Sequence, residues 1–172
     1  ATHGRVTQAN AHPHCDGAAR VHIVLNGIVE NHAALRRRLE ADGAVFTSET
    51  DAEVVAHLIV SLYDGDLVDA VRRTRPHHEG HYAFVASAVD EPRLLVGARR
   101  ECPLVVGVGE GERFIASALP AFLGETRSAI AVEDGELVVA TPDESWLERD
   151  GGTRTVRGAQ TVDWTEAEAE RA

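Results

Sequence analysis

The first third of the chain combines a short apolar run with stretches whose apolar residues recur at helical spacing. Residues 21–25 (VHIVL) predict a strand, and Asn26-Gly27 directly after them is a strong turn signal. Asn31 is suited to cap a helix over residues 32–42, and Gly43 is a fitting C-terminal stop. We therefore expect a strand, a turn and a helix in that order.

A second helical pattern begins at Thr50-Asp51-Ala52-Glu53, which has the sequence of a capping box. It follows a short segment, residues 44–48, that is predicted to be extended. The apolar residues of this helix recur at the spacing of a core face and are Val54, Val55, Leu58, Ile59 and Leu62. A third helix is predicted from Leu67 to near Pro76.

From residue 81 onward the pattern changes to short β-rich runs separated by Gly, Pro or Asp at hairpin spacing. The runs are residues 82–89, 93–98, 104–108, 113–117, 129–132 and 136–141. A helical turn is predicted at 120–123, and the acidic residues 163–172 predict a helix start or a linker. The order indicates an α+β fold, with early helices followed by an antiparallel meander.

Composition narrows the class of protein. With 172 residues, of which 44% are hydrophobic and 26% charged, the chain corresponds to one globular domain or to most of one. A formal net charge of −11 argues against nucleic acid as a partner, because phosphate binding needs a basic patch. No apolar run approaches the roughly 20 residues that span a bilayer, and two cysteines form no disulfide framework. We expect a cytoplasmic protein without a membrane partner.

Four motifs, in the right order, carry a resemblance to a known family. They are ATHG at residues 1–4, NAHPH at 10–14, NGIVEN at 26–31 and SETD at 48–51. Together they resemble the glutaminase domain, a class II glutamine amidotransferase, of the glutamine–fructose-6-phosphate aminotransferases. Weaker similarity follows at residues 102–107, 114–117 and 133–136. The NAHPH motif favours this family over the amidophosphoribosyltransferases.

The resemblance implies an N-terminal-nucleophile hydrolase, whose fold is a four-layer αββα sandwich. A cysteine at the mature N-terminus attacks the side-chain amide of L-glutamine, and its α-amine acts as the base. The ammonia passes to sugar-isomerase domains, where fructose 6-phosphate becomes glucosamine 6-phosphate. The resemblance also implies a homodimeric parent and no cofactor.

The resemblance assigns roles to five residues. Asn26 and Gly27 match the oxyanion-hole pair, an amide side chain and a backbone N–H, which stabilise the negative oxygen of the intermediate. Asp51 matches the carboxylate that holds the α-ammonium of glutamine. Thr2 and His3 match the strand that lines the glutamine pocket.

The chain also departs from the family pattern. The family's nucleophilic cysteine, and the Arg-Trp pair before ATHG, precede the segment that matches residue 1. We therefore expect residues 1–162 to be an incomplete amidotransferase domain that lacks its first strands and helix and is inactive alone. Residues 163–172 would begin a linker toward a sugar-isomerase domain. Cys102, Leu25 and Ala118 replace the Ser, His and Asp that are usual at these positions.

Simpler interpretations exist for several of these residues. Asn26-Gly27 is compatible with an ordinary turn, Asp51 with a helix N-cap, and His3 with a buried structural histidine. His12 and His14 lack further ligands at metal-site spacing, so we expect no metal and assign them to a loop hydrogen-bonded to backbone. His77, His78 and His81 are expected at the surface or at a strand edge.

Two functional alternatives stay open. Leu25 and Ala118 motivate a degenerate amidotransferase-like domain with a binding or scaffolding role. The other alternative is a different class II amidotransferase, such as an amidophosphoribosyltransferase.

Overall fold

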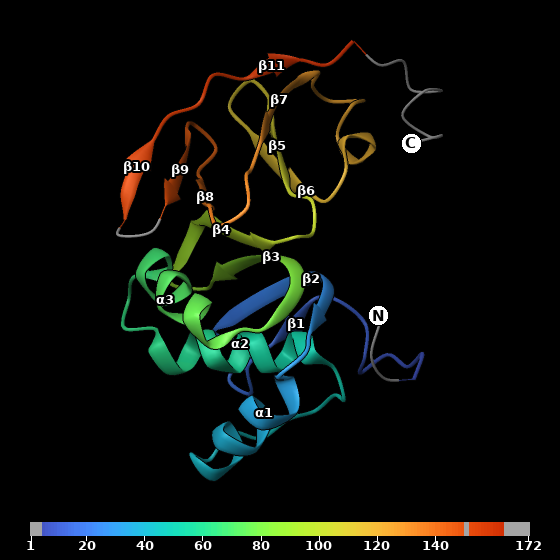
Figure 1. Cartoon of the computed structure of the whole chain (residues 1–172), viewed down its shortest axis with the longest axis vertical. Helices are drawn as coiled ribbons and strands as arrows, with labels where there is room; N and C mark the ends of the chain where they lie inside the picture. The colour runs from blue at the N-terminus through green and yellow to red at the C-terminus, as the bar shows by residue number, and fades with distance from the viewer. Residues whose placement is uncertain (1–4, 150–151, 164–172) are drawn as a thin grey trace.

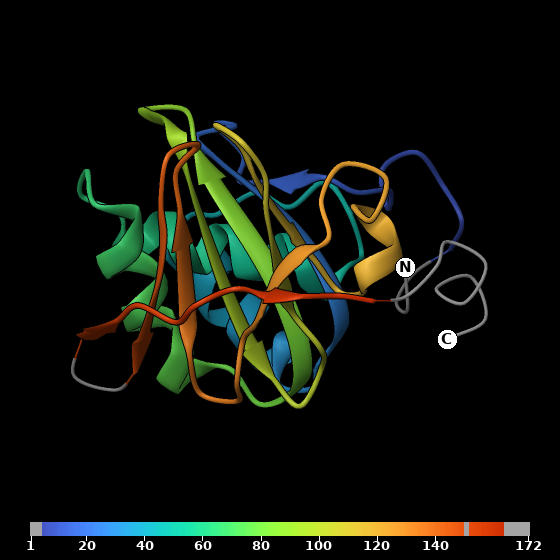
Figure 2. The ribbon, with the colours of Figure 1, turned by 90° about the horizontal axis from the view of Figure 1, so that it is seen from above.

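Three helices cover one face of a seven-stranded antiparallel sheet, and a four-stranded antiparallel sheet covers the other face (Figure 1). The computed structural model describes residues 5–149 and 152–163. Figure 2 looks down through the smaller sheet onto the larger one, with the helices behind both. The predicted α+β class is confirmed. Within the described ranges a helical layer covers only the larger sheet, so three of the four layers of the expected sandwich are present.

The larger sheet has the strand order β1-β2-β3-β4-β8-β9-β10. Its strands are β1 (His14–Cys15), β2 (Val21–Val29), β3 (Gly80–Ala88), β4 (Glu91–Arg100), β8 (Leu137–Ala140), β9 (Ser145–Arg149) and β10 (Thr153–Thr155). The smaller sheet has the order β11-β7-β5-β6. Its strands are β5 (Val105–Val108), β6 (Arg113–Ala116), β7 (Ser128–Ala131) and β11 (Gln160–Thr161). The expected meander is therefore divided between two sheets.

The helices are α1 (His32–Ala41), α2 (Asp51–Leu62) and α3 (Leu67–Thr74), with 3₁₀ turns η1 (Arg75–His77) and η2 (Leu119–Ala121). All three predicted helices are confirmed. Helix α2 packs against β2 and is buried on nearly every side, with Val54, Val55, Leu58 and Ile59 fully inaccessible. Its apolar residues belong to the core between helices and sheet, as predicted. None of the described helices is long and apolar enough to cross a membrane.

Asn26-Gly27 does not form the predicted turn. Strand β2 continues through both residues to Val29 and pairs with β3 along its whole length, with Asn26 opposite Ala83 and Gly27 opposite Tyr82. The positive φ that Asn-Gly sequences favour is present, because Gly27 has φ +103°. Because β2 stays paired with the long strand β3, the positive φ of Gly27 produces a local distortion inside the strand instead of a turn.

Two smaller expectations also need correction. Asn31 immediately precedes α1, but its side chain does not cap the helix. Its amide instead donates to the carbonyl of His77 and accepts from the N–H of Glu79, joining the start of α1 to the start of β3. His78 is only 1% exposed and packs edge-on against Tyr82, so it is a core residue rather than a surface one.

Candidate functional site

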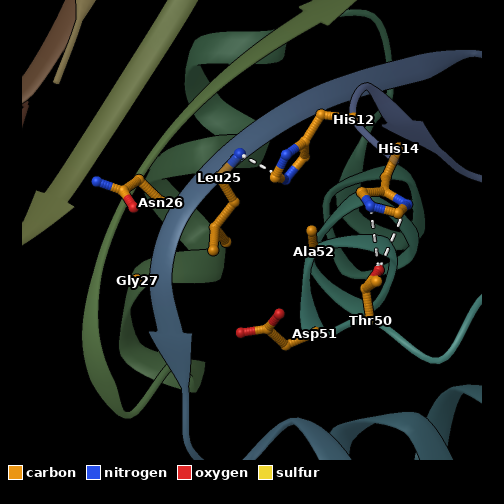
Figure 3. Close-up of a pocket in the computed structure, with 8 residues that line it drawn as sticks. All are labelled: His12, His14, Leu25, Asn26, Gly27, Thr50, Asp51 and Ala52. Carbon is orange, nitrogen blue, oxygen red and sulfur yellow. Dashed lines mark hydrogen bonds between the residues drawn. The ribbon is translucent and has the colours of Figure 1, made fainter. Parts of the chain in front are cut away.

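A cavity of about 280 Å³ lies where β2, the start of α2 and the segment 10–14 meet (Figure 3). The lining residues are His12, His14, Leu25, Asn26, Gly27, Thr50, Asp51 and Ala52. Three residues that the sequence assigned to the glutamine site, Asn26, Gly27 and Asp51, thus border one cavity. Thr2 and His3 lie outside the described residues.

Asp51 is the first residue of α2 and forms part of the cavity wall. The N-cap is Thr50, so the simpler interpretation of Asp51 as the cap is wrong. Asp51 is 4% exposed, and its Oδ2 accepts a hydrogen bond of 2.8 Å from the N–H of Val29. The carboxylate lies at the positive end of the α2 dipole. Among the described residues the carboxylate has no ion pair, which leaves it able to accept hydrogen bonds from a cationic ligand.

Asn26 lies on the opposite face of β2 from Leu25, as the alternation of a strand requires. Leu25 is buried toward the helices, whereas the exposed Asn26 side chain points away from Leu25 and Asp51 in Figure 3. Asn26 also borders a second cavity of about 220 Å³, lined by residues of both sheets such as Phe84 and Ile115. Its amide is thus presented toward the space between the two sheets.

Gly27 is held in a closely packed environment. A Cβ atom at this position would lie 2.2 Å from the carbonyl oxygen of His81 and 2.9 Å from Cys102 Sγ. Together with the positive φ, these approaches restrict the position to glycine. Gly27 lies midway in sequence between Leu25 and Val29. The N–H of Leu25 donates to His12 Nε2 at 3.3 Å, and the N–H of Val29 donates to Asp51.

The segment 10–14 joins the other parts of the site through three side chains. Asn10 Oδ1 accepts from the N–H of Glu49, and His12 Nε2 accepts from Leu25. Each ring nitrogen of His14 lies 3.3 Å from Thr50 Oγ1. The expected backbone bond is thus present for His12, whereas His14 lies on strand β1 rather than in a loop and its ring meets a hydroxyl. Burial lowers the pKa of both histidines, which favours the neutral imidazole that His12 needs to accept a hydrogen bond.

Neither cysteine lines this cavity. Cys15 lies on β1, and Cys102 packs behind Gly27. Burial raises the pKa of both thiols, which disfavours the nucleophilic thiolate at neutral pH. In the described part of the chain, no group of three His, Cys, Asp or Glu side chains is arranged to hold a metal ion.

Leu25 and Ala118, two of the three replacements in the family pattern, occupy different environments. Leu25 is 8% exposed and forms part of the cavity wall, so it changes the polarity of the site. Ala118 is exposed before η2 and does not border the cavity. Sequence reasoning named the motifs that contain Asn10, His14 and Thr50 but gave these residues no part in the site. The contacts that connect them are between distant segments, which no local pattern reveals.

Comparison with solved structures identifies the class of protein. Glutamine phosphoribosylpyrophosphate amidotransferase from B. subtilis, complexed with ADP and GMP, matches with a TM-score of 0.71 and 25% identity over 86% of this chain and 33% of that one. A glutamine aminotransferase class-II domain protein from Silicibacter pomeroyi shares the fold, with a TM-score of 0.58 and 17% identity over 86% of this chain and 74% of that one. The fold is therefore that of the class II glutamine amidotransferases, which are N-terminal-nucleophile hydrolases.

Sequence comparison identifies the family. The glutamine amidotransferase domain family matches residues 3–124, and the chain belongs to this family. It is 48% identical to a glutamine–fructose-6-phosphate aminotransferase (isomerizing) of Symbiobacterium thermophilum and 42% identical to one of Aquifex aeolicus, in each case over 99% of this chain. The chain spans 28% and 29% of these two relatives.

Proposed function

We propose that this chain is the glutamine-hydrolysing part of a glutamine–fructose-6-phosphate aminotransferase, which uses glutamine to make glucosamine 6-phosphate from fructose 6-phosphate. The observation that carries the proposal is the 48% identity over 99% of the chain to a relative of that name. The shared lining of one cavity by Asp51, Asn26 and Gly27 supports it. Binding of the sugar and transfer of ammonia are assigned to the parent protein, because the chain spans less than a third of its relatives.

In this proposal Asp51 binds the α-ammonium of L-glutamine. A carboxylate that is 4% exposed and tethered to β2 through Val29 is held in one position, so the ammonium meets a preorganised partner. Thr2 and His3 would line the same pocket. No cofactor is required for this binding.

Asn26 and Gly27 would stabilise the oxyanion that forms when a nucleophile attacks the glutamine amide. Removing one donor from such a site typically costs about 3–4 kcal/mol of transition-state stabilisation. The nucleophile is assigned to the parent protein, because neither Cys15 nor Cys102 lines the cavity.

The alternative acceptor, phosphoribosylpyrophosphate, is motivated by the structural similarity to the B. subtilis amidotransferase. The sequence identities of 48% to the aminotransferase and 25% to that amidotransferase favour fructose 6-phosphate. Supplying the parent protein with glutamine and either acceptor, and measuring glutamate and the aminated product, distinguishes the two. Absence of glutamate formation with either acceptor would support the degenerate binding domain instead.

The role of Asp51 is tested by Asp51→Asn in the parent protein. The amide oxygen of Asn can still accept from Val29, but the charge that holds the ammonium is lost. We expect the KM for glutamine to rise about 10- to 100-fold, as for loss of a charged hydrogen bond. The matched control is Asp64→Asn, which changes an exposed carboxylate between α2 and α3. Equal KM values for the two variants would refute the assignment.

The resemblance further supports a homodimeric parent that works in the cytoplasm. Light scattering coupled to size-exclusion chromatography of the parent protein tests the dimer. A monomer with full activity would contradict it.

A further inference from the structure

Glu53 is a buried carboxylate that the proposed reaction does not use. It is 1% exposed and accepts four hydrogen bonds from the loop before α2. Its Oε1 accepts from the N–H and hydroxyl of Thr47, at 2.7 and 2.9 Å. Its Oε2 accepts from the N–H and hydroxyl of Ser48, at 2.6 and 2.5 Å. One side chain thus satisfies four donors of two adjacent residues.

This arrangement differs from the predicted capping box. The first half is present, because Thr50 Oγ1 accepts from the N–H of Glu53 at 3.3 Å. In the second half the glutamate of a capping box returns to the N–H of the cap residue. Here Glu53 accepts from residues 47 and 48, which precede the cap residue. The N–H of Thr50 donates to Ser48 Oγ instead. Glu53 therefore fixes the loop of residues 47–50 in addition to the end of the helix.

This loop leads into the cavity wall, because Thr50 at its end and Asp51 directly after it line the cavity. Ser48 Oγ, bound to Glu53, also lies 2.9 Å from Thr50 Oγ1, and Thr50 contacts His14 across the cavity rim. Arg36 fixes the same loop from the other side, through a 2.8 Å hydrogen bond to the carbonyl of Ser48. Asp51 follows directly in the chain, so its position depends on the conformation of residues 47–50.

The carboxylate has no strong cationic partner. The nearest basic group in the described ranges is His57, whose Nε2 lies 3.8 Å from Oε1. Burial lowers the pKa of this histidine, which favours its neutral form. Burial would raise the pKa of Glu53, but the hydrogen bonds from Ser48 and Thr47 outweigh it and hold that pKa below its usual value. An ionised Glu53 is maintained by the loop that it orders.

We propose that Glu53 is a positioning residue of the glutamine site, which holds residues 47–50 so that Thr50 and Asp51 face the cavity. The inference rests on the proposed function, because it assumes that Asp51 binds glutamine. A glutamine at this position has one acceptor oxygen, so the backbone N–H of either Thr47 or Ser48 loses its acceptor and faces the amide NH2. The hydroxyl of the same residue can then only accept from that NH2.

The test is Glu53→Gln in the parent protein, assayed for glutamine hydrolysis at a temperature where circular dichroism shows it folded. We expect the KM for glutamine to rise about tenfold or more, with kcat changed less than about twofold. The matched control is Glu49→Gln, whose exposed side chain lies in the same loop. It should leave both constants unchanged. A purely structural glutamate would lower thermal stability without this separation of KM from kcat.

Two outcomes separate this inference from the proposed function. If the unmodified parent does not hydrolyse glutamine, the proposed function fails. If the parent is active and Asp51→Asn raises KM, but Glu53→Gln behaves like Glu49→Gln, the positioning role alone is refuted.

Milder variants decide the question if Glu53→Gln fails to fold. Ser48→Ala and Thr47→Val each remove one hydroxyl donor and leave three donors on the carboxylate. We expect Thr47→Val to raise the KM for glutamine about two- to fivefold, as for loss of a single hydrogen bond. Ser48→Ala should raise it at least as much, because Ser48 Oγ also bonds to the N–H and hydroxyl of Thr50. An unchanged KM in both variants would overturn the proposal.

Discussion

At the scale of single residues, His78 shows how a polar group is accommodated in the core. Its ring contacts Tyr82 and Phe84, and in the described part of the chain neither ring nitrogen has a hydrogen-bond partner. Burial lowers the pKa of His78 to about 4, with smaller contributions from His77 and Arg100. The neutral imidazole is therefore the form that the folded protein contains at neutral pH.

The depressed pKa of His78 predicts a loss of stability in acid. The unfolded chain binds a proton near the ordinary histidine pKa of 6.5, whereas the folded chain does so only near 4. Stability is therefore fully present above about pH 6.5 and falls as the pH decreases toward 4, by about 3 kcal/mol in total. Urea unfolding of the wild type and of His78→Phe across this range measures the effect. The variant should lose this contribution, and the exposed His77→Gln should retain it.

A pH dependence of equal size in wild type and His78→Phe would contradict this account. The sequence did not reveal the burial of His78, because His77, His78 and Glu79 form a polar run typical of a surface. Only the pairing of β3 inside the larger sheet brings this ring against the core aromatic residues. Glu53 is a similar case, since its spacing from Thr50 predicted a capping box but not the hydrogen bonds to residues 47 and 48.

At the scale of elements, the parts predicted best are those whose signal is local. Helix α2 has a cap at Thr50 and apolar residues at regular spacing, and the structure places it as expected. Strand β2 was predicted four residues too short, because its pairing partner β3 lies more than 50 residues later in the chain. Strands β1, β9, β10 and β11 were not predicted. The residues of β10 and β11 are exposed and lack an alternating apolar face.

Gly27 allows a direct test of the distortion in β2. Alanine would meet both an unfavourable φ of +103° and the carbonyl oxygen of His81 at 2.2 Å. We expect Gly27→Ala to lower the free energy of unfolding by at least about 2 kcal/mol. Gly43→Ala is the matched control, because Gly43 has φ +96° with no atom within 4 Å of an added Cβ. It should cost only about 1 kcal/mol.

Denaturant titrations of the two glycine variants measure this difference. An equal loss of unfolding free energy in both variants would contradict this prediction. It would mean that the positive φ alone restricts Gly27 and that β3 shifts away from an added Cβ without loss of stability. The family resemblance, and not the turn signal, predicts a functional role for Gly27. Its conformation inside a strand depends on tertiary pairing.

At the scale of the whole molecule, two cores hold the three layers together. One lies between the helices and the larger sheet, and the other lies between the sheets around Leu104, Val106 and Val138. The candidate site lies beside the first core, at the start of α2, and Asn26 reaches toward the second. Sequence motifs identified the segments of this site, but their meeting at β2 is a result of the complete fold.

A polypeptide of these 172 residues is expected not to hydrolyse glutamine. The physical reason is that no thiol lines the cavity and that burial raises the pKa of Cys15 and Cys102. Glutamate release from the purified chain, followed over hours, measures this. Detectable release that disappears in Cys15→Ser or Cys102→Ser would contradict it, because one of these thiols would then be the nucleophile.

The side chains that shape the cavity have a consequence for association between molecules. Strand β1 pairs with β2 only at residues 22 and 23, so beyond them that edge of β2 has no neighbouring strand in the described ranges. His12 and Asp51 occupy two of its N–H groups, at Leu25 and Val29. With these two donors bonded to side chains, the edge is a poorer template for a foreign strand. The interactions that define the site thus also protect the sheet from edge-to-edge aggregation.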